Sequence, residues 1–496
     1  MKYTSLLIIC VLLLFQIKIK AQKADKTVIP KFSVSKKTTH NIPKGQDYTF
    51  GYLEVPENRA VNNEKTIKIP VYIFKSRRAT PKKDPIIYTV GGPGATTMPS
   101  AQYMKYYKYL DDRDFILIEQ RGNYYAKPHL DCPEWLQAVS QSNLLDLKGI
   151  SSDSILMKAA ADCRKGLVKK GIDLNAYNTN EIAADINDLV NVLQIEKYNL
   201  LTISYSTKIA QVLMRDYPER IRSVVMDSPL PLAVNYDEES VENPLETVHT
   251  LLSDCEEDDA CNAAFPDIKK RFFDYLKDKT NHPLELAVYN PNSKKEENFY
   301  IKGKDLITIF TSASTADVGN VPFEIHKILN NDLTLIKEQL SGLFTTPVIN
   351  DGIGMRLSVW CAEETPFVAE EIIQKETTRY AEVSGLSPAV FEKNICTVWG
   401  VKKVADIENK PVSSAIPVLL INGAYDNETP PKWAAQMMKN LKNSYHIIFK
   451  GWKHTPTTNW QNQCAMEAAN IFFNNPTVKP KPNCLSSIEK PSFKVE

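Results

Sequence analysis

The sequence predicts an α/β fold with a mostly parallel sheet and helices on both faces. Short apolar segments recur along the chain and stop at glycine, serine or aspartate, as buried strands do. Stretches with apolar residues at helical spacing separate several of these segments. The 496 residues are 43% hydrophobic and 24% charged, a globular composition with room for two domains or one domain with an insertion.

The predicted elements alternate through the first half of the chain. Residues 66–73 alternate apolar and polar, the pattern of a half-buried strand. Further strands are predicted over 86–90, 115–118, 200–203 and 224–226, with helices over 181–193 and 206–216. Strands at 418–421 and 447–449, with a helix over 432–441 between them, resume the pattern near the end. Such alternation favours a parallel sheet.

The alternation stops between about 236 and 409. This stretch is charged and has helical spacing, for example over 266–278 and 322–341. We expect a mainly helical cap over 236–409, inserted between a first core part at 45–235 and a second core part at 410–496.

The first residues have the layout of a signal peptide. Lys2 precedes an apolar run over 6–15, and Ala21 follows shortly after. The run is shorter than the roughly 20 apolar residues of a membrane-spanning helix, and no other segment approaches that length. We therefore expect a cleaved segment over 1–21, no membrane span, and a protein exported to a periplasm or secreted.

The cysteine count agrees with export. Nine cysteines less Cys10, in the signal segment, leave eight, and an even number in an exported chain suggests disulfides rather than free thiols. Eight cysteines allow 105 connectivities. Proximity in the sequence favours Cys132–Cys163, Cys255–Cys261, Cys361–Cys396 and Cys464–Cys484. The chain has no Cys-x-x-Cys pair and its seven histidines are scattered, so no metal site is expected.

The chemistry centres on Ser204. A predicted strand runs into this serine and a predicted helix follows at once, which is the layout of a nucleophile elbow. The elbow consensus is Gly-x-Ser-x-Gly, whereas Thr202 and Ser206 stand at the glycine positions. Local sequence alone is more typical of a serine that begins a helix.

Two later residues complete a candidate triad. Asp426 follows the predicted strand at 418–421, and His454 follows the one at 447–449. The order serine, acid, histidine is the order of this architecture, and all three lie just past strand ends, where an open α/β sheet places its site. An aspartate in a turn or a lone histidine would be weak alone; the three in order are more specific.

The run Gly91-Gly92-Pro93-Gly94 follows an early strand and adds an oxyanion site. The N–H groups of Gly92 and Tyr205 are the candidate donors to an acyl oxygen. A phosphate cradle is a poor interpretation because no Gly-Lys-Ser/Thr follows, and a plain turn is the remaining alternative.

Lys plus Arg total 60 against 59 Asp plus Glu. The chain therefore has no strong positive electrostatic field that would favour binding to nucleic acid.

Together these features resemble the proline iminopeptidase and tripeptidyl aminopeptidase group of serine peptidases, in the α/β-hydrolase superfamily. The resemblance is closest to the secreted branch with a TAP-like C-terminal region, and it spans roughly 45–490. The matching stretches are 51–57, 91–94, 121–122, 128–134, 183–186, 214–219, 222–228 and 426–431, with His454, Cys464 and Cys484.

The resemblance implies a role for each candidate residue. Ser204 would be the nucleophile, His454 the general base and acid, and Asp426 the orienting carboxylate. Aminopeptidases of this family hold the substrate's free amine with acidic residues, and the candidates here are Glu363 and Glu364, with ordinary surface charge as the alternative. No cofactor is expected, the partner is a peptide or small ester, and the oligomeric state is left open.

Four family glycines are replaced in this chain, by Thr202, Ser206, Tyr124 and Lys453. Thr202 is expected to crowd the elbow, and Lys453 either lowers the pKa of the neighbouring His454 or points into solvent. The losses keep two alternatives open beside an exported aminopeptidase: a carboxylesterase of the same fold, and a non-catalytic binding relative.

Overall fold

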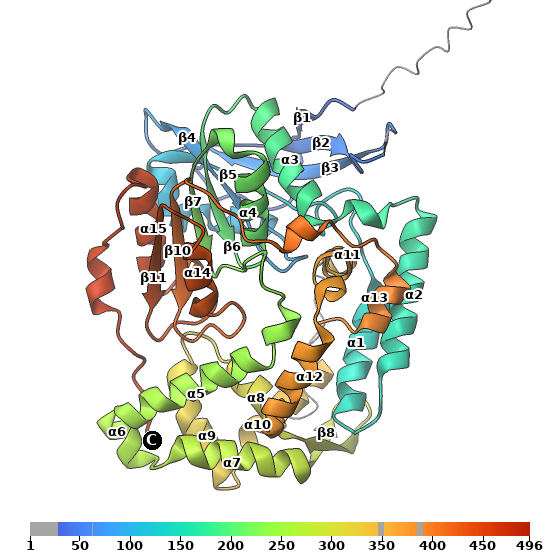
Figure 1. Cartoon of the computed structure of the whole chain (residues 1–496), viewed down its shortest axis with the longest axis vertical. Coiled ribbons are helices and arrows are strands. Elements are labelled where there is room, and N and C mark those ends of the chain that lie inside the picture. The colour runs from blue at the N-terminus through green and yellow to red at the C-terminus, as the bar shows by residue number, and fades with distance from the viewer. Residues whose placement is uncertain (1–27, 62, 346–351, 384–389) are drawn as a thin grey trace, which may run out of the picture.

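The computed structural model describes residues 28–61, 63–345, 352–383 and 390–496. Within them, nine strands form one sheet in the order β1-β2-β3-β5-β4-β6-β7-β10-β11 (Figure 1). Strands β4, β5, β6, β7, β10 and β11 pair in parallel, whereas β1, β2 and β3 form an antiparallel edge. The strands are Lys31–Val34, Tyr48–Pro56, Thr66–Phe74, Lys82–Thr89, Arg113–Ile118, Tyr198–Ile203, Ile221–Asp227, Val418–Gly423 and Ser444–Phe449.

Most of the helices precede β10 in the chain, and two follow it. Before β10 lie α1 Pro133–Asp146, α2 Asp153–Lys169, α3 Thr179–Val192, α4 Ser206–Asp216, α5 Glu242–Glu257, α6 Asp259–Ala264, α7 Ile268–Asn281, α8 Gly303–Thr311, α9 Val321–Leu329, α10 Thr334–Thr345, α11 Ile353–Glu363, α12 Glu370–Arg379 and α13 Lys393–Trp399. After β10, the described residues contain α14 Pro431–Met438 and α15 Cys464–Asn474.

Helices cover both faces of the sheet because successive strand residues point to opposite sides. In β6, Leu200 packs in a cluster with residues of α3, α4 and α14. Its neighbour Leu201 packs in a second cluster, with α15 and the 3₁₀ turns that follow β4. The predicted fold class, a mostly parallel sheet covered on both faces, is confirmed.

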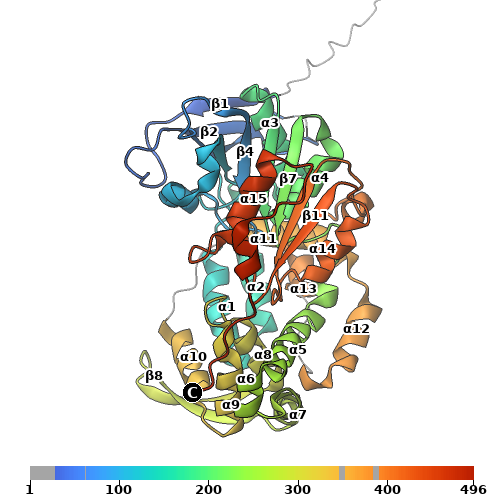
Figure 2. The ribbon, with the colours of Figure 1, turned by 90° about the vertical axis from the view of Figure 1, so that its left-hand side faces the viewer.

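A second, largely helical layer lies below the carboxyl ends of these strands (Figures 1 and 2). It contains α5 to α10 around one hydrophobic cluster, while α1 and α2 pack with α11 and α13 in another. The layer also holds a hairpin of β8 Leu284–Asn290 and β9 Lys295–Ile301, which was not predicted from the sequence. The boundaries 45–235, 236–409 and 410–496 remain predictions.

The helical spacing over 322–341 corresponds to two helices in the structure. The structure has α9 and α10 there, separated where Asn331 takes a φ of 68°. A left-handed residue cannot continue a right-handed helix, so the chain turns before α10 begins. Apolar residues repeat at helical spacing on both sides of Asn331, so the periodicity alone does not indicate where the first helix ends.

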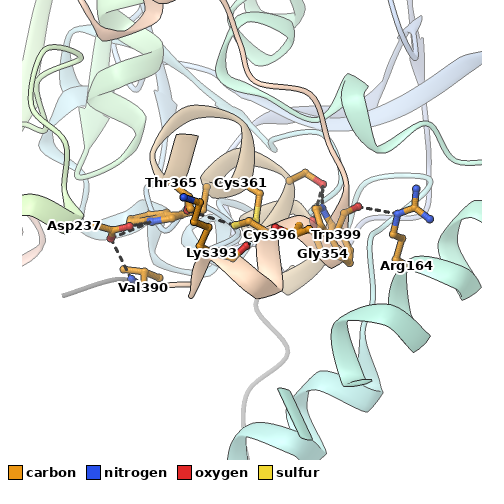
Figure 3. The surroundings of a disulfide bond; sticks show 12 residues. Arg164, Asp237, Gly354, Cys361, Thr365, Val390, Lys393, Cys396 and Trp399 are labelled. Carbon is orange, nitrogen blue, oxygen red and sulfur yellow. Dashed lines mark hydrogen bonds between the residues drawn. A yellow bond between two sulfur atoms is a disulfide. The ribbon is translucent and has the colours of Figure 1, made fainter. Parts of the chain in front are cut away.

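Four disulfides join the pairs that sequence proximity favours, which confirms that expectation. Their Cα atoms are 5.2 Å apart in Cys132–Cys163, 5.3 Å in Cys255–Cys261, 5.0 Å in Cys361–Cys396 and 5.8 Å in Cys464–Cys484. Figure 3 shows the bridge from α11 to α13, beside which the indole of Trp399 donates to Ser358.

Disulfides in these positions are consistent with an exported protein. The predicted signal segment, 1–21, lies outside the described residues. In the described part of the chain, no helix combines the length and the apolar character that crossing a bilayer requires.

Candidate active site

Ser204 lies on the turn between β6 and α4, at the carboxyl edge of the sheet. Its φ is 56°, a left-handed value that is rare for a residue with a side chain. Its N–H donates to the carbonyl of Asp227, 2.9 Å away, and Thr207 N–H donates back to the Ser204 carbonyl. The turn therefore has the strained strand-to-helix geometry that raises a serine above its sheet.

The glycine run after β4 packs directly against this turn. A Cβ added at Gly91 would lie 2.7 Å from the Cβ of Ser204, so only glycine fits there. Gly92 has a φ of 113°, which again favours glycine. Among the described residues, neither the Gly92 N–H nor the Tyr205 N–H donates to a protein acceptor. Both amides are thus free for an oxyanion.

Asp426 and His454 form the second half of the site. His454 Nδ1 is 2.9 Å from Asp426 Oδ2 and 3.0 Å from Oδ1. The carboxylate is buried and also accepts from Glu428 N–H at 3.0 Å and from Thr429, whose N–H and hydroxyl both lie at 2.9 Å. These contacts fix the aspartate, which in turn orients the imidazole.

Asp426 and His454 shift each other's pKa in the directions expected for an ion pair. Burial alone would raise the pKa of Asp426, but the imidazole and the Thr429 donors hold it below its usual value. Burial would likewise lower the pKa of His454, but Asp426, Glu428 and Asp227 outweigh that effect and raise it to about 9. These carboxylates therefore favour the protonated imidazole, the form that a histidine takes after it accepts a proton.

The outer edge of His454 faces an exposed carboxylate. Its Nε2 atom is 3.7 Å from Oε2 of Glu428, a side chain that is 56% exposed. In the described part of the chain, no hydrogen bond joins Ser204 Oγ to His454. The structure therefore brings Ser204, Asp426 and His454 to one edge of the sheet, after β6, β10 and β11, and leaves Nε2 beside Glu428.

Two protein families match the chain. The family described as "alpha/beta hydrolase fold" matches residues 84–261, and the family described as "TAP-like protein" matches residues 384–484. These matches agree with the sheet order and with the position of the strand ends that carry the candidate triad. The chain has the α/β-hydrolase fold. Its C-terminal part is TAP-like.

The hydrolase is similar to peptidases at low identity. It is 21% identical over 458 residues to tripeptidyl aminopeptidase of Streptomyces coelicolor, covering 87% of this chain and 81% of that one. It is 19% identical over 294 residues to serine protease Hip1 of Mycobacterium tuberculosis, covering 56% of each chain. A solved proline iminopeptidase of Mycobacterium smegmatis aligns at 13% identity and a TM-score of 0.38, covering 86% of this chain and 98% of that one.

The hydrolase accommodates two of its replaced glycines without distorting the strand. Thr202 is buried and keeps its place in β6, paired with Thr89 and Met226 on either side. The Ser206 hydroxyl accepts from Ile203 N–H at 2.8 Å and lies 2.9 Å from the Thr89 carbonyl. The predicted crowding by Thr202 is therefore not seen; at Ser206 the added hydroxyl cross-links the turn.

Lys453 belongs to the interior. Its side chain is 7% exposed, and Nζ donates to the Thr311 carbonyl at the end of α8 and to Asn427 Oδ1, at 2.5 and 2.9 Å. Burial lowers the pKa of Lys453 to about 8, against the opposing effects of Asp426 and Glu428. The expectation that Lys453 points into solvent is therefore wrong. The pKa of His454 is raised by its neighbouring carboxylates, and a lowering effect of Lys453 stays a prediction.

Glu363 and Glu364 are buried beside the elbow helix, so their interpretation as surface charge is wrong. Glu363 accepts from the N–H and hydroxyl of Thr179, at 2.6 and 2.5 Å, and burial raises its pKa to about 7. Glu364 pairs with the buried Lys208 of α4. Thr179 also bonds the Tyr205 hydroxyl, so these carboxylates brace the residues after the nucleophile.

Two further carboxylates at this site were not predicted from the sequence. Glu428 lies two residues after Asp426, and its place in that loop was the available signal. Asp227 is the last residue of β7 and precedes Ser228. In the sequence analysis, Asp227 and Ser228 were noted only within a stretch that resembles the family. A strand-terminal aspartate one strand from the elbow is the pattern that would have found it.

Proposed function

We propose that the protein is an exported serine hydrolase, an aminopeptidase that releases N-terminal residues or short peptides. The observation that carries the proposal is the left-handed Ser204 turn together with the hydrogen-bonded His454–Asp426 pair, which follow the carboxyl ends of β6, β10 and β11 in one sheet. The Gly91 packing and the free amides of Gly92 and Tyr205 support an oxyanion site.

The proposed reaction follows from these positions. Ser204 Oγ attacks the scissile carbonyl while its proton passes to His454 Nε2, and Asp426 stabilises the imidazolium through Nδ1–H. The Gly92 and Tyr205 amides hold the tetrahedral oxyanion. His454 then gives its proton to the leaving amine, and water, deprotonated by the same nitrogen, releases the acyl group from Ser204.

The exopeptidase assignment draws on the relatives' names and on the charge at the site. A peptide's free amino terminus is a cation, and the sequence candidates for binding it are Glu363 and Glu364. Their carboxylates already have partners in Thr179 and Lys208, whereas Glu428 is more than half exposed next to His454. We therefore add Glu428 to the candidate amine site.

Export to a periplasm or out of the cell is part of the proposal. The signal-like residues 1–21 and the four disulfides support it.

A fluorophosphonate probe tests the proposal on purified protein with its disulfides formed. We expect covalent labelling at Ser204, located by mass spectrometry, which is absent in Ser204→Ala and weakened in His454→Ala. Labelling at another serine, or none on well-folded protein, would refute a serine mechanism.

Peptide substrates then test the exopeptidase assignment. We expect cleavage of peptides with a free amino terminus and little cleavage of the same peptides after acetylation. A protein that hydrolyses a p-nitrophenyl ester but neither peptide would be the esterase alternative.

A further inference from the structure

One buried carboxylate connects the loops that carry the candidate nucleophile and histidine. Asp227, at the end of β7, is fully buried. Its backbone carbonyl accepts from Ser204 N–H at 2.9 Å. Its side-chain oxygen Oδ2 accepts from Thr457 N–H at 2.8 Å and from the Thr457 hydroxyl. The same residue thus holds the nucleophile turn through its backbone and the histidine loop through its side chain.

The neighbouring residue extends this connection. Ser228 Oγ accepts from Thr455 N–H at 2.8 Å, and Ser228 N–H donates to the Ile421 carbonyl of β10 at 2.7 Å. Residues 227–228 therefore contact the loop that follows His454 and the strand that leads to Asp426. The nucleophile turn, the histidine loop and β10 all meet at this dipeptide.

The backbone around Asp227 is strained in three places. Ser204, Ser228 and Thr455 have φ values of 56°, 54° and 60°, which side-chain-bearing residues rarely adopt. Such conformations are unfavourable for residues with a side chain and persist only where surrounding contacts enforce them. The hydrogen bonds to residues 227 and 228 are contacts of this kind, since each joins a strained residue or its near neighbour.

The charge of Asp227 also reaches His454. The titratable groups that act on the imidazole are Asp426 and Glu428 from the loop after β10, and Asp227 from β7. Lys453, on the histidine's own loop, interacts with Asp426 and Glu428. Asp227 itself interacts with His454, Asp426 and the buried hydroxyl of Tyr109. Burial raises the pKa of Asp227 to about 7, while the Thr457 donors and the His454 imidazole act in the opposite direction and favour its charged form.

We infer that Asp227 is a positioning residue, which locks the His454 loop against the Ser204 turn and adds to the stabilisation of the imidazolium by Asp426. The inference rests on the proposed function for its catalytic consequence. Asp227 is fully buried, and it acts through Thr457 and the charge on His454.

Two substitutions separate its geometric and electrostatic roles. In Asp227→Asn the amide oxygen can still accept from Thr457, so we expect kcat within a few-fold of wild type. The lost charge lowers the pKa of His454, so the acid limb of kcat/KM moves to lower pH by about half a unit. In Asp227→Ala the loop loses its anchor, and we expect kcat to fall about a hundredfold with little change in KM.

Asp84→Asn is the matched control. Asp84 lies near the start of β4, at the other end of the sheet, and pairs with Arg113 at 2.9 Å and Arg222 at 3.4 Å. Its substitution removes a structural carboxylate without touching the candidate site. We expect lower stability with an unchanged kcat and an unchanged pH profile per folded molecule.

A readout independent of catalysis keeps the inference separate from the proposed function. NMR titration of the imidazole, assigned with His454→Gln, measures the pKa of His454 in wild type, Asp227→Asn and Asp84→Asn. A lower pKa in Asp227→Asn alone, together with faster amide exchange at Thr457 in Asp227→Ala, supports the inference even if the protein cleaves no substrate. An unchanged His454 pKa in Asp227→Asn, or unchanged exchange at Thr457 in a folded Asp227→Ala, would overturn it.

Discussion

At the scale of single residues, Ser206 shows how a lost glycine can be structural. Its hydroxyl is a buried acceptor for Ile203 N–H where the β6 ladder ends. Ser206→Ala leaves this amide buried without a partner, and we expect a loss of about 1–3 kcal/mol in the free energy of unfolding. Denaturant titration measures it against Ser312→Ala, at an exposed site, which should cost under about 0.5 kcal/mol. Equal losses would contradict a structural role for the Ser206 hydroxyl.

Glu428, after Asp426, contributes to the raised pKa of His454. The histidine acts as a base only when neutral, and three carboxylates hold its pKa near 9. Glu428→Gln removes one of them, so the pKa falls and the neutral fraction at pH 7 rises.

We expect the acid limb of kcat/KM to move to lower pH by about half a unit, because a half-exposed ion pair is worth at most about 1 kcal/mol. Glu428→Asp, which keeps the charge, is the control. A limb that stays in place in Glu428→Gln would show that Glu428 does not act on Nε2.

At the scale of elements, the buried strands were predictable because a parallel sheet buries both faces and leaves short apolar runs. The observed strands extend a few residues beyond the predicted ones. In β7, for example, the predicted strand starts at residue 224, whereas the observed strand starts at residue 221. The β8–β9 hairpin was missed because its second strand, Lys295–Ile301, begins with three charged residues and is mostly exposed. Its pairing depends on the cap around it, which local sequence does not encode.

The disulfides give an element-scale prediction. Cys361–Cys396 joins α11 to α13 across 35 residues, whereas Cys255–Cys261 closes a separation of 6 between α5 and α6. Loop entropy predicts that replacing both cysteines by serine costs about 4 kcal/mol for the first bridge and about 2 kcal/mol for the second. Thermal unfolding of the two double variants, compared with wild type, checks the order. A larger loss at Cys255–Cys261 would contradict it.

At the scale of the whole molecule, the order of the candidate triad could be predicted, and its surroundings could not. Strand ends fix where Ser204, Asp426 and His454 lie, since parallel strands end at one edge. The contacts of Lys453 with Thr311, and of Glu363 with Thr179, join segments more than 100 residues apart. Such contacts depend on how the helical layer packs against the sheet, and local sequence patterns do not predict that packing.

The C-terminal tail is a connection of the same kind. It leaves the sheet region and runs along the helical layer (Figure 2). Lys490 pairs with Asp254 and Glu257 of α5, each at 2.7 Å, and Lys494 N–H donates to the Gly319 carbonyl at 3.1 Å. Phe493 packs against the α5–α10 cluster. The tail therefore fastens the helical layer to the part of the chain that carries His454.

Gly319 makes room for this tail, which allows a test by two independent changes. A Cβ at Gly319 would lie 2.4 Å from the Ser492 carbonyl oxygen, so Gly319→Ala should displace the tail. Removing residues 489–496 should cost about 2 kcal/mol through lost apolar contacts and speed amide exchange in α5 and α9. We expect Gly319→Ala to destabilise the full chain but to have almost no effect in the truncated one. The truncated chain lacks the Ser492 carbonyl oxygen with which the added methyl group would clash. An equal loss in the free energy of unfolding in the full and the truncated chain would mean that glycine is needed at position 319 by the helical layer rather than by the tail.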